Sequence, residues 1–198
     1  MKRIVLGSAS PRRKELLEQI GISFEIKTSS KDECYTSEIP EEIVKELALQ
    51  KAENVADEIL SNEGVIKSTV VIGADTIVAL DQEILGKPKN EEDAFRMISN
   101  LQGRAHQVFT GTALLFFDED GNKTVVNHAV ETKVYVNPMS DQEIYEYIDS
   151  KEPMDKAGAY GIQGGFAAYI DRIEGDYYNV VGLPVSYIYQ ELKKAKAI

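Results

Sequence analysis

Apolar residues recur along the chain with two different spacings, which predict both helices and strands. Between Pro40 and about Leu60, apolar side chains return every three or four residues, at positions 43, 44, 47, 48, 52, 55, 56 and 59. This spacing is typical of one face of an α-helix. The apolar runs at Arg3–Gly7 and Thr69–Leu80 predict buried strands instead.

Polar residues just before other apolar runs predict where further helices begin. Ser10 is followed by Pro11, Asn90 precedes a periodic run, and Ser140 with Glu143 has the spacing of a capping box. A last helix is expected from Pro184. The predicted helices that these caps start span 11–20, 91–101 and 141–149.

Short apolar runs predict the remaining strands. Gln107–Phe117 and Thr124–Val136 flank a polar turn and predict a β-hairpin. Phe24–Thr28 and Phe166–Ile173 are expected to be strands, with loops at 29–38 and 174–182 and a loop with a turn of helix at 153–165. Because strands and helices alternate early and a hairpin follows, the fold class predicted is α/β: a mixed β-sheet with flanking helices, in a single domain of residues 1–198.

Composition narrows the class of protein. No run approaches the ~20 apolar residues of a membrane span, and the first apolar run is shorter than a secretory signal requires. A net charge of −11 argues against nucleic acid and anionic membranes as partners. Cys34 is the single cysteine, which excludes an internal disulfide and favours a cytoplasmic location.

Three cations, Arg12, Arg13 and Lys14, occupy the first turn of the helix predicted behind Ser10. The helix dipole disfavours cations there, whereas a bound phosphate would explain them. Truncating Arg12 or Arg13 should then leave the ligand-free protein equally stable or slightly more so. A solvated basic turn that pairs with carboxylates elsewhere is the open alternative.

Asp75 interrupts the apolar run Val70–Leu80. Because a buried, unpaired charge is costly, its carboxylate should be paired, metal-bound or catalytic. A strand-end aspartate satisfied by backbone amides is an equally good interpretation of the pattern alone. Gly73 beside it would let another group approach the backbone closely.

Glycines crowd the stretch Ala157–Gly165 around one amide side chain, Gln163. Such a loop can wrap closely around a ligand, and an amide can both donate to and accept from a base. Alternatively, the stretch is a tight connection with Gln163 pointing to water. By position alone, Lys51, Lys87 and Glu33 are interpreted as ordinary solvated charges, and His106 and His128 as structural because they lack metal-ligand spacing.

Taken together, these stretches resemble the Maf family of septum-formation-inhibitor-like nucleotide pyrophosphatases. The similar segments follow the family's order over essentially the whole chain: Ser8–Arg13, Gly73–Val78, Gly86–Pro88, Glu152–Gly164, and Gly175–Tyr178 with Val181–Pro184. The Ala159–Gly164 segment resembles the branch that acts on dTTP and UTP. Gly165-Phe166 departs from the family pattern, which often has a larger residue followed by glycine.

The resemblance implies a fold like that of inosine triphosphate pyrophosphatases, with two lobes around a cleft and often a homodimer. It implies hydrolysis of nucleoside triphosphates to the monophosphate and pyrophosphate with Mg²⁺ or Mn²⁺. On this resemblance, Asp75 is the general base, and Asp75 and Glu33 hold the metal. Arg12, Thr76 and Gln163 are implied to select the substrate. Phosphate contacts are implied for Ser8, Arg12, Arg13, Lys51 and Lys87.

Three other interpretations remain open at this stage. One is hydrolysis of 7-methyl-GTP, which is the activity of another branch of the family. A second is a non-enzymatic regulator of septum formation acting through protein partners, which would not need Asp75. A third is a nucleic-acid binder, which should show basic residues beyond the Arg12-Arg13-Lys14 turn.

Overall fold

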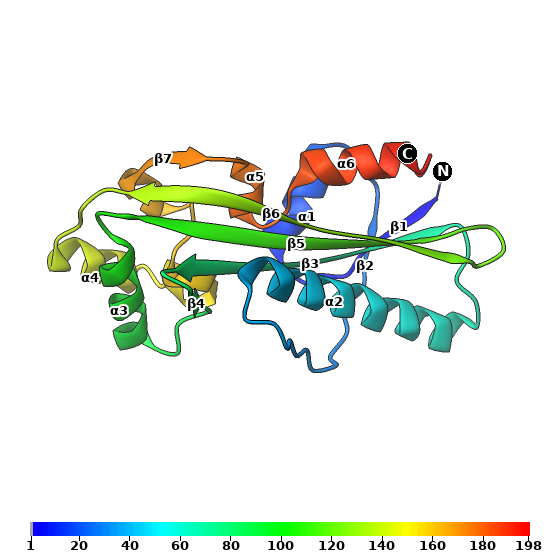
Figure 1. The fold of residues 1–198 in the computed structure, drawn as a ribbon, viewed down its shortest axis with the longest axis horizontal. Coiled ribbons are helices and arrows are strands. Elements are labelled where there is room, and N and C mark those ends of the chain that lie inside the picture. The colour runs from blue at the N-terminus through cyan, green and yellow to red at the C-terminus, as the bar shows by residue number, and fades with distance from the viewer. Residues whose placement is uncertain (1) are drawn as a thin grey trace. The chain divides into compact units, whose positions relative to one another are not determined.

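A seven-stranded mixed β-sheet runs through the computed structural model, which describes residues 2–198 (Figure 1). The strand order is β2-β1-β3-β5-β6-β7, and β4 pairs with β3. β1 is parallel to both β2 and β3, whereas the β3–β4 and β6–β7 pairs are antiparallel. The strands are β1 (Arg3–Leu6), β2 (Glu25–Ile26), β3 (Thr69–Leu80), β4 (Glu83–Leu85), β5 (Ala105–Phe117), β6 (Lys123–Val136) and β7 (Ile170–Glu174).

The helices flank this sheet, so the predicted α/β class is confirmed. No helix within residues 2–198 is long and apolar enough to cross a membrane. Asn90 and Ser140 cap their helices as predicted, and Ser140 completes a capping box with Glu143. The helices are α1 (Pro11–Gln19), α2 (Pro40–Glu63), α3 (Glu91–Leu101), α4 (Asp141–Asp149), α5 (Tyr177–Val181) and α6 (Val185–Lys194).

The structure differs from the sequence prediction in several segments. Strand β4 was not predicted, and the strand predicted at Phe24–Thr28 is shorter, at Glu25–Ile26. Ser10 occupies the N-cap position of α1, but its side chain makes no capping hydrogen bond. The strand predicted at Phe166–Ile173 is wrong in its first half, because Gly165–Tyr169 forms a 3-10 turn and β7 begins at Ile170. The loop predicted at 174–182 contains the short helix α5.

The chain forms two compact units, and each unit combines segments that are distant in sequence. The first unit comprises Met1–Asp75, Thr110–Val130 and Gly182–Ile198, and the second comprises Thr76–Phe109 and Glu131–Val181. Strands β3, β5 and β6 contribute residues to both units. The structural description below therefore takes each unit by itself.

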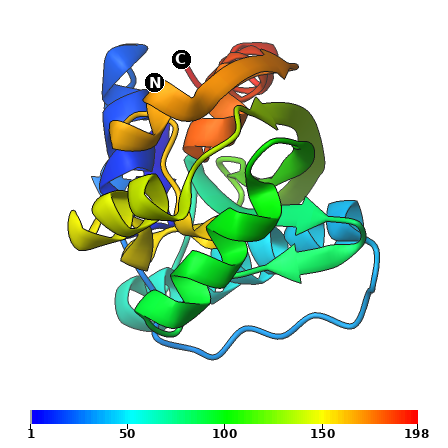
Figure 2. The ribbon, with the colours of Figure 1, turned by 90° about the vertical axis from the view of Figure 1, so that its left-hand side faces the viewer.

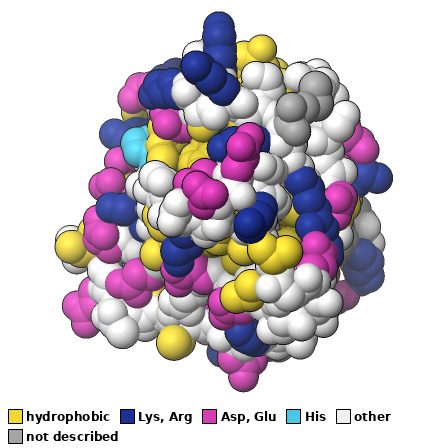
Figure 3. All heavy atoms as spheres, turned by 90° about the vertical axis from the view of Figure 1, so that its right-hand side faces the viewer, with side chains coloured by type: hydrophobic (Ala, Val, Ile, Leu, Met, Phe, Trp, Pro, Cys, Tyr) yellow, Lys and Arg dark blue, Asp and Glu magenta, His cyan; other side chains and the backbone are white. Residues whose placement is uncertain are grey.

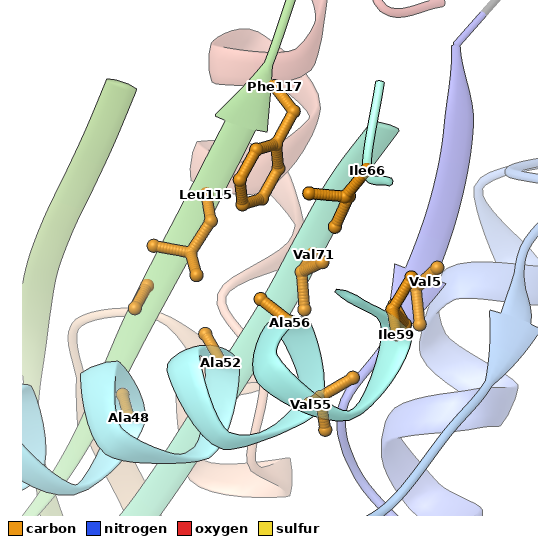
Figure 4. Packing of buried hydrophobic residues seen from close by; sticks show 11 residues of the cluster. Val5, Ala48, Ala52, Val55, Ala56, Ile59, Ile66, Val71, Leu115 and Phe117 are labelled. Carbon is orange, nitrogen blue, oxygen red and sulfur yellow. The ribbon is translucent and has the colours of Figure 1, made fainter. Parts of the chain in front are cut away.

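In the first unit, helix α2 packs on one face of β1, β3 and β5, while α1 and α6 lie on the opposite face (Figures 1 and 2). The facing strands present large apolar side chains, and α2 presents small ones such as Ala48 and Ala52, which let it approach closely (Figure 4). The cluster comprises Val5, Ala48, Ala52, Val55, Ala56, Ile59, Ile66, Val71, Ala113, Leu115 and Phe117.

Gly73 of β3 lies where α2 packs closely against the sheet. A Cβ atom there would lie 2.2 Å from the carbonyl oxygen of Ala48 and 2.7 Å from the amide nitrogen of Ala52. Neither backbone atom can give way without shifting the helix. The close approach expected at Gly73 is thus confirmed, and the approaching group is α2.

We expect Gly73→Ala to lower the free energy of unfolding by about 1–3 kcal/mol, because the added methyl group overpacks this contact. Thermal and urea unfolding of the ligand-free protein would measure the loss. Gly86→Ala is the matched control, since a Cβ atom at Gly86 would meet nothing within 4 Å. Equal stability of the two variants would contradict the contact.

In the second unit, aromatic side chains form the core below the glycine-rich stretch. Phe166 is fully buried, and its ring centroid lies 4.7 Å from that of Tyr160 and 5.2 Å from that of Tyr147. His106 Nε2 and the Tyr160 hydroxyl are 2.7 Å apart. Burial lowers the pKa of His106 to about 4, so the ring is neutral at pH 7. This geometry confirms the structural role expected of His106.

Candidate functional site

The Asp75 carboxylate is paired, as the cost of burying it alone requires. Asp75 lies in β3 with 18% of its side chain exposed, and Lys51 Nζ of α2 donates to its Oδ1 at 2.5 Å. The strand thus presents a paired, partly solvated carboxylate in the middle of an apolar run. Such a group can accept a proton or bind a cation.

Lys51 joins two carboxylates. Its Nζ also lies 2.7 Å from Glu33 Oε2, in the segment between β2 and α2. The interpretation of Lys51 as an ordinary solvated charge is therefore wrong, since its side chain is only 22% exposed and contacts two carboxylates. Glu33 is an exposed residue, as expected, but its carboxylate is paired. Asp75 and Glu33, far apart in sequence, converge on one ammonium group.

Polar side chains of α2 position the Glu33 segment. The Gln50 amide clamps the backbone of Cys34, because its Oε1 accepts from Cys34 N at 3.1 Å and its Nε2 donates to Cys34 O at 2.5 Å. One turn earlier, Glu46 Oε2 accepts from Thr36 N at 2.8 Å. The roles of Gln50 and Glu46 were not identified from the sequence. The available signal was the four-residue spacing between these polar side chains on the helix opposite a polar loop.

Arg13 ties together segments of the first unit that are distant in sequence. Its Nε donates to the carbonyl oxygen of Gly182 at 2.8 Å, and its Nη1 donates to Ala74 O at 2.9 Å and to the Ser8 hydroxyl at 3.2 Å. Burial lowers the pKa of Arg13 below its ordinary value, and the nearby Asp75 carboxylate opposes this shift. The guanidinium therefore fixes the loop after β1 against β3.

The three cations of the α1 turn have different surroundings. Ser8 is buried, and Arg12 and Arg13 are partly buried. Lys14 is exposed and lies 3.7 Å from Glu18 on the same helix. The alternative interpretation of a solvated basic turn therefore describes Lys14, but it does not describe the partly buried Arg12 and Arg13.

The remaining predicted residues belong to the second unit. Thr76 follows Asp75 in β3 and is partly buried, whereas Lys87 and Gln163 are exposed. The segments that carry Lys87 and Gln163 are hydrogen-bonded to each other, since Gly158 N donates to Gly86 O at 3.0 Å. Gly158 has a φ of 69° and leaves room for Val78 of β3. The structure thus brings these two segments together beside β3.

The carboxylates of the first unit suit a divalent cation that is also bound by substrate. Among residues 2–198 there is no group of three or more His, Cys, Asp or Glu residues that could hold a metal ion. Asp75 and Glu33 nevertheless converge on one cationic group. Mg²⁺ commonly uses one or two carboxylates and completes its shell with phosphate oxygens and water. The donor set therefore fits such a metal.

Comparison with known proteins shows the family to which the chain belongs. The chain belongs to the family of Maf-like proteins, whose model matches residues 3–195. It is 50% identical to a dTTP/UTP pyrophosphatase of Agathobacter rectalis over 98% of each chain. It is 47% identical to a dTTP/UTP pyrophosphatase of Lachnoclostridium phytofermentans over 98% of this chain and 95% of that protein.

Similarity to a solved structure is weaker. The Ham1 protein of Staphylococcus aureus matches with a TM-score of 0.49 and 15% identity, over 98% of this chain and 100% of that chain.

Proposed function

We propose that this protein hydrolyses dTTP and UTP to the nucleoside monophosphate and pyrophosphate. The relatives named dTTP/UTP pyrophosphatase support the reaction, since they are about as long as this chain and 47% and 50% identical to it. The structural observation that carries the proposal is the convergence of Asp75 and Glu33 on Lys51. A regulator acting only through partners would not need this arrangement of charges.

In the proposed mechanism, Asp75 is the general base. Water attacks the α-phosphorus, the bond from that phosphorus to the α–β bridging oxygen breaks, and pyrophosphate leaves. The proton of the attacking water passes to a carboxylate oxygen of Asp75. Lys51 orients this carboxylate through its 2.5 Å contact.

Asp75 and Glu33 would hold the divalent metal, Mg²⁺ or Mn²⁺. When bound, such a metal neutralises the charge that develops on the leaving pyrophosphate. The cations Arg12, Lys51 and Lys87 would add to this stabilisation through contacts with phosphate oxygens. Ser8 and Arg13 would shape the phosphate-binding turn, because Arg13 holds the Ser8 hydroxyl at 3.2 Å.

Base selection is proposed for Gln163, together with Thr76 and Arg12. The exposed amide of Gln163 can pair with the adjacent carbonyl and N–H of thymine or uracil, and cytosine reverses this pattern at its amino group. Once a bound base covers this amide, one mismatched polar group should discriminate between uracil and cytosine by roughly 5–150-fold.

We expect kcat/KM to rank dTTP and UTP above the other triphosphates and Gln163→Ala to flatten this ranking. Pyrophosphate release from natural triphosphates and 7-methyl-GTP, with Mg²⁺ or Mn²⁺, would measure both. Gln142→Ala is the matched control, because Gln142 is an exposed amide of the same unit on α4. Preference for 7-methyl-GTP, or an unchanged ranking in Gln163→Ala, would contradict the assignment.

The charge distribution supports a small anionic substrate over nucleic acid. Figure 3 shows Lys and Arg side chains interspersed with Asp and Glu side chains on the face that it presents. Several cations of the first unit are also neutralised by ion pairs, such as Arg3 with Glu63 at 2.7 Å and Lys123 with Glu53 at 3.1 Å. The cytoplasmic location and the homodimer stay predictions, and light scattering would test the second.

A further inference from the structure

The backbone on both sides of Gln163 is held by one pair of side chains. Two residues before it, Gly161 N donates to the Tyr147 hydroxyl at 3.2 Å. Two residues after it, Gly165 N donates to Glu152 Oε2 at 2.9 Å. The chain of hydrogen bonds closes between the two side chains, because the Tyr147 hydroxyl donates to Glu152 Oε1 at 3.0 Å.

The glycines of this segment make room for the Glu152 carboxylate. A Cβ atom at Gly164 would lie 2.0 Å from Glu152 Oε1, so a larger residue would displace the carboxylate. The expectation, drawn from the density of glycines, that this stretch serves a ligand is thus incomplete. At least Gly164 serves the contact with Glu152, which lies in the 3-10 turn Glu152–Asp155.

Tyr147 is a rigid support for this arrangement. Its side chain on α4 is buried, and its ring packs against the fully buried Phe166. Burial raises the pKa of the Tyr147 hydroxyl above its ordinary value, so the group stays protonated and able to donate to Glu152.

Gln163 itself is exposed at the centre of the held segment. A glycine-rich backbone has a large conformational freedom, which must be lost when a base binds. Fixing the amides of Gly161 and Gly165 removes much of this freedom before the substrate arrives. The hydrogen bonds therefore act on the segment that carries Gln163, one of the side chains that we assign to base selection.

We propose that Glu152, acting through Tyr147 and these two glycine amides, is a positioning residue that sets the base selectivity of Gln163. The inference rests on the proposed function, because it requires Gln163 to contact the base. It assigns no contact with substrate to Glu152. It predicts that Glu152 and Gln163 are energetically coupled in their effect on base selectivity.

The test compares kcat/KM for UTP and CTP in the wild type, Glu152→Ala, Gln163→Ala and the double variant, with Mg²⁺ present. We expect Glu152→Ala to reduce the UTP-to-CTP ratio by about tenfold, the scale of a displaced contact or one unpaired hydrogen bond. In the Gln163→Ala background the same change should alter the ratio by less than about twofold, because coupled residues are not additive.

Three further variants separate positioning from a general loss of structure. Glu152→Gln keeps an acceptor for Gly165 N and should restore most of the selectivity. Tyr147→Phe should give an intermediate ratio, since it removes the contacts of the hydroxyl with Gly161 and Glu152 but leaves the hydrogen bond from Gly165 N to Glu152. Glu146→Ala is the matched control, because Glu146 is an exposed carboxylate on α4 of the same unit.

Hydrogen exchange of the ligand-free protein gives a readout besides activity. We expect the Gly161 and Gly165 amides to exchange faster in Glu152→Ala than in the wild type. An equal loss of kcat/KM for every base in both backgrounds, or a ratio that Glu152→Ala leaves unchanged, would overturn the inference alone. A wild type without base preference would overturn the proposed function and the inference together.

Discussion

Replacing Asp75 with asparagine should lower the turnover of pyrophosphate release by about 10²–10⁴-fold, the usual contribution of a general base. Asparagine has nearly the same size, and its side-chain oxygen can still accept the hydrogen bond from Lys51 Nζ. The variant should therefore fold, but it has no carboxylate to take the proton. Steady-state turnover at saturating dTTP or UTP would measure the loss.

The matched control for this experiment is Asp171→Asn, because Asp171 is an exposed carboxylate on β7. It should retain wild-type turnover. Near-wild-type turnover of Asp75→Asn would refute the role of Asp75 as the base. If excess Mg²⁺ restored the activity of Asp75→Asn, metal binding would be the main role of this carboxylate.

Replacing Arg13 with alanine should lower the free energy of unfolding of the ligand-free protein by about 3 kcal/mol, since it removes charge-assisted hydrogen bonds and strands their acceptors. For a chain of this size, the melting temperature should fall by about 6–12 °C. The sequence alone, with Arg13 interpreted as a phosphate ligand, predicted instead that the ligand-free variant would be equally stable or slightly more stable. The expectation differs because the guanidinium donates hydrogen bonds to Gly182, Ser8 and Ala74 in the folded protein.

Lys14→Ala is the control for Arg13, because it removes the same charge from the next position of α1 and disrupts only an exposed ion pair. Its melting temperature should stay within about 2 °C of the wild type, as expected for a surface substitution. Arg13→Lys should be nearly as unstable as Arg13→Ala, since an ammonium group cannot reproduce the planar fork. A stable Arg13→Ala variant would show that the contacts with Ala74 and Gly182 contribute little.

Local sequence signals sufficed where the neighbouring residues determine the structure. The helix behind Asn90 begins and ends as predicted, because a side-chain cap and an apolar period are both local. The bounds of β3 were also predicted, since a long apolar run between polar residues leaves few alternatives. Phe166 shows the limit of the same rule. It looks like a strand residue, but it lies in a 3-10 turn, where its buried ring packs against three aromatic neighbours.

The partners of the site residues could not be predicted. Asp75 was identified as a carboxylate that needs a partner, but nothing near it in sequence indicates Lys51. The acceptors of Arg13 include Gly182, a backbone oxygen at the other end of the chain. Backbone acceptors carry no signature in the sequence of side chains. Glu152 was recognised only as part of a family segment, because its role depends on a contact with Gly165.

The discontinuity of the first unit has a consequence for how the protein is made on the ribosome. Arg13 and Asp75 are synthesised early, but the segment Gly182–Ile198, which completes their unit, emerges after the entire second unit. The Arg13–Gly182 hydrogen bond cannot form during most of synthesis. Such late, non-local contacts slow folding and leave apolar surface exposed in the meantime. Nascent chains stalled before residue 182 should therefore bind chaperones for longer than the chain released from the ribosome.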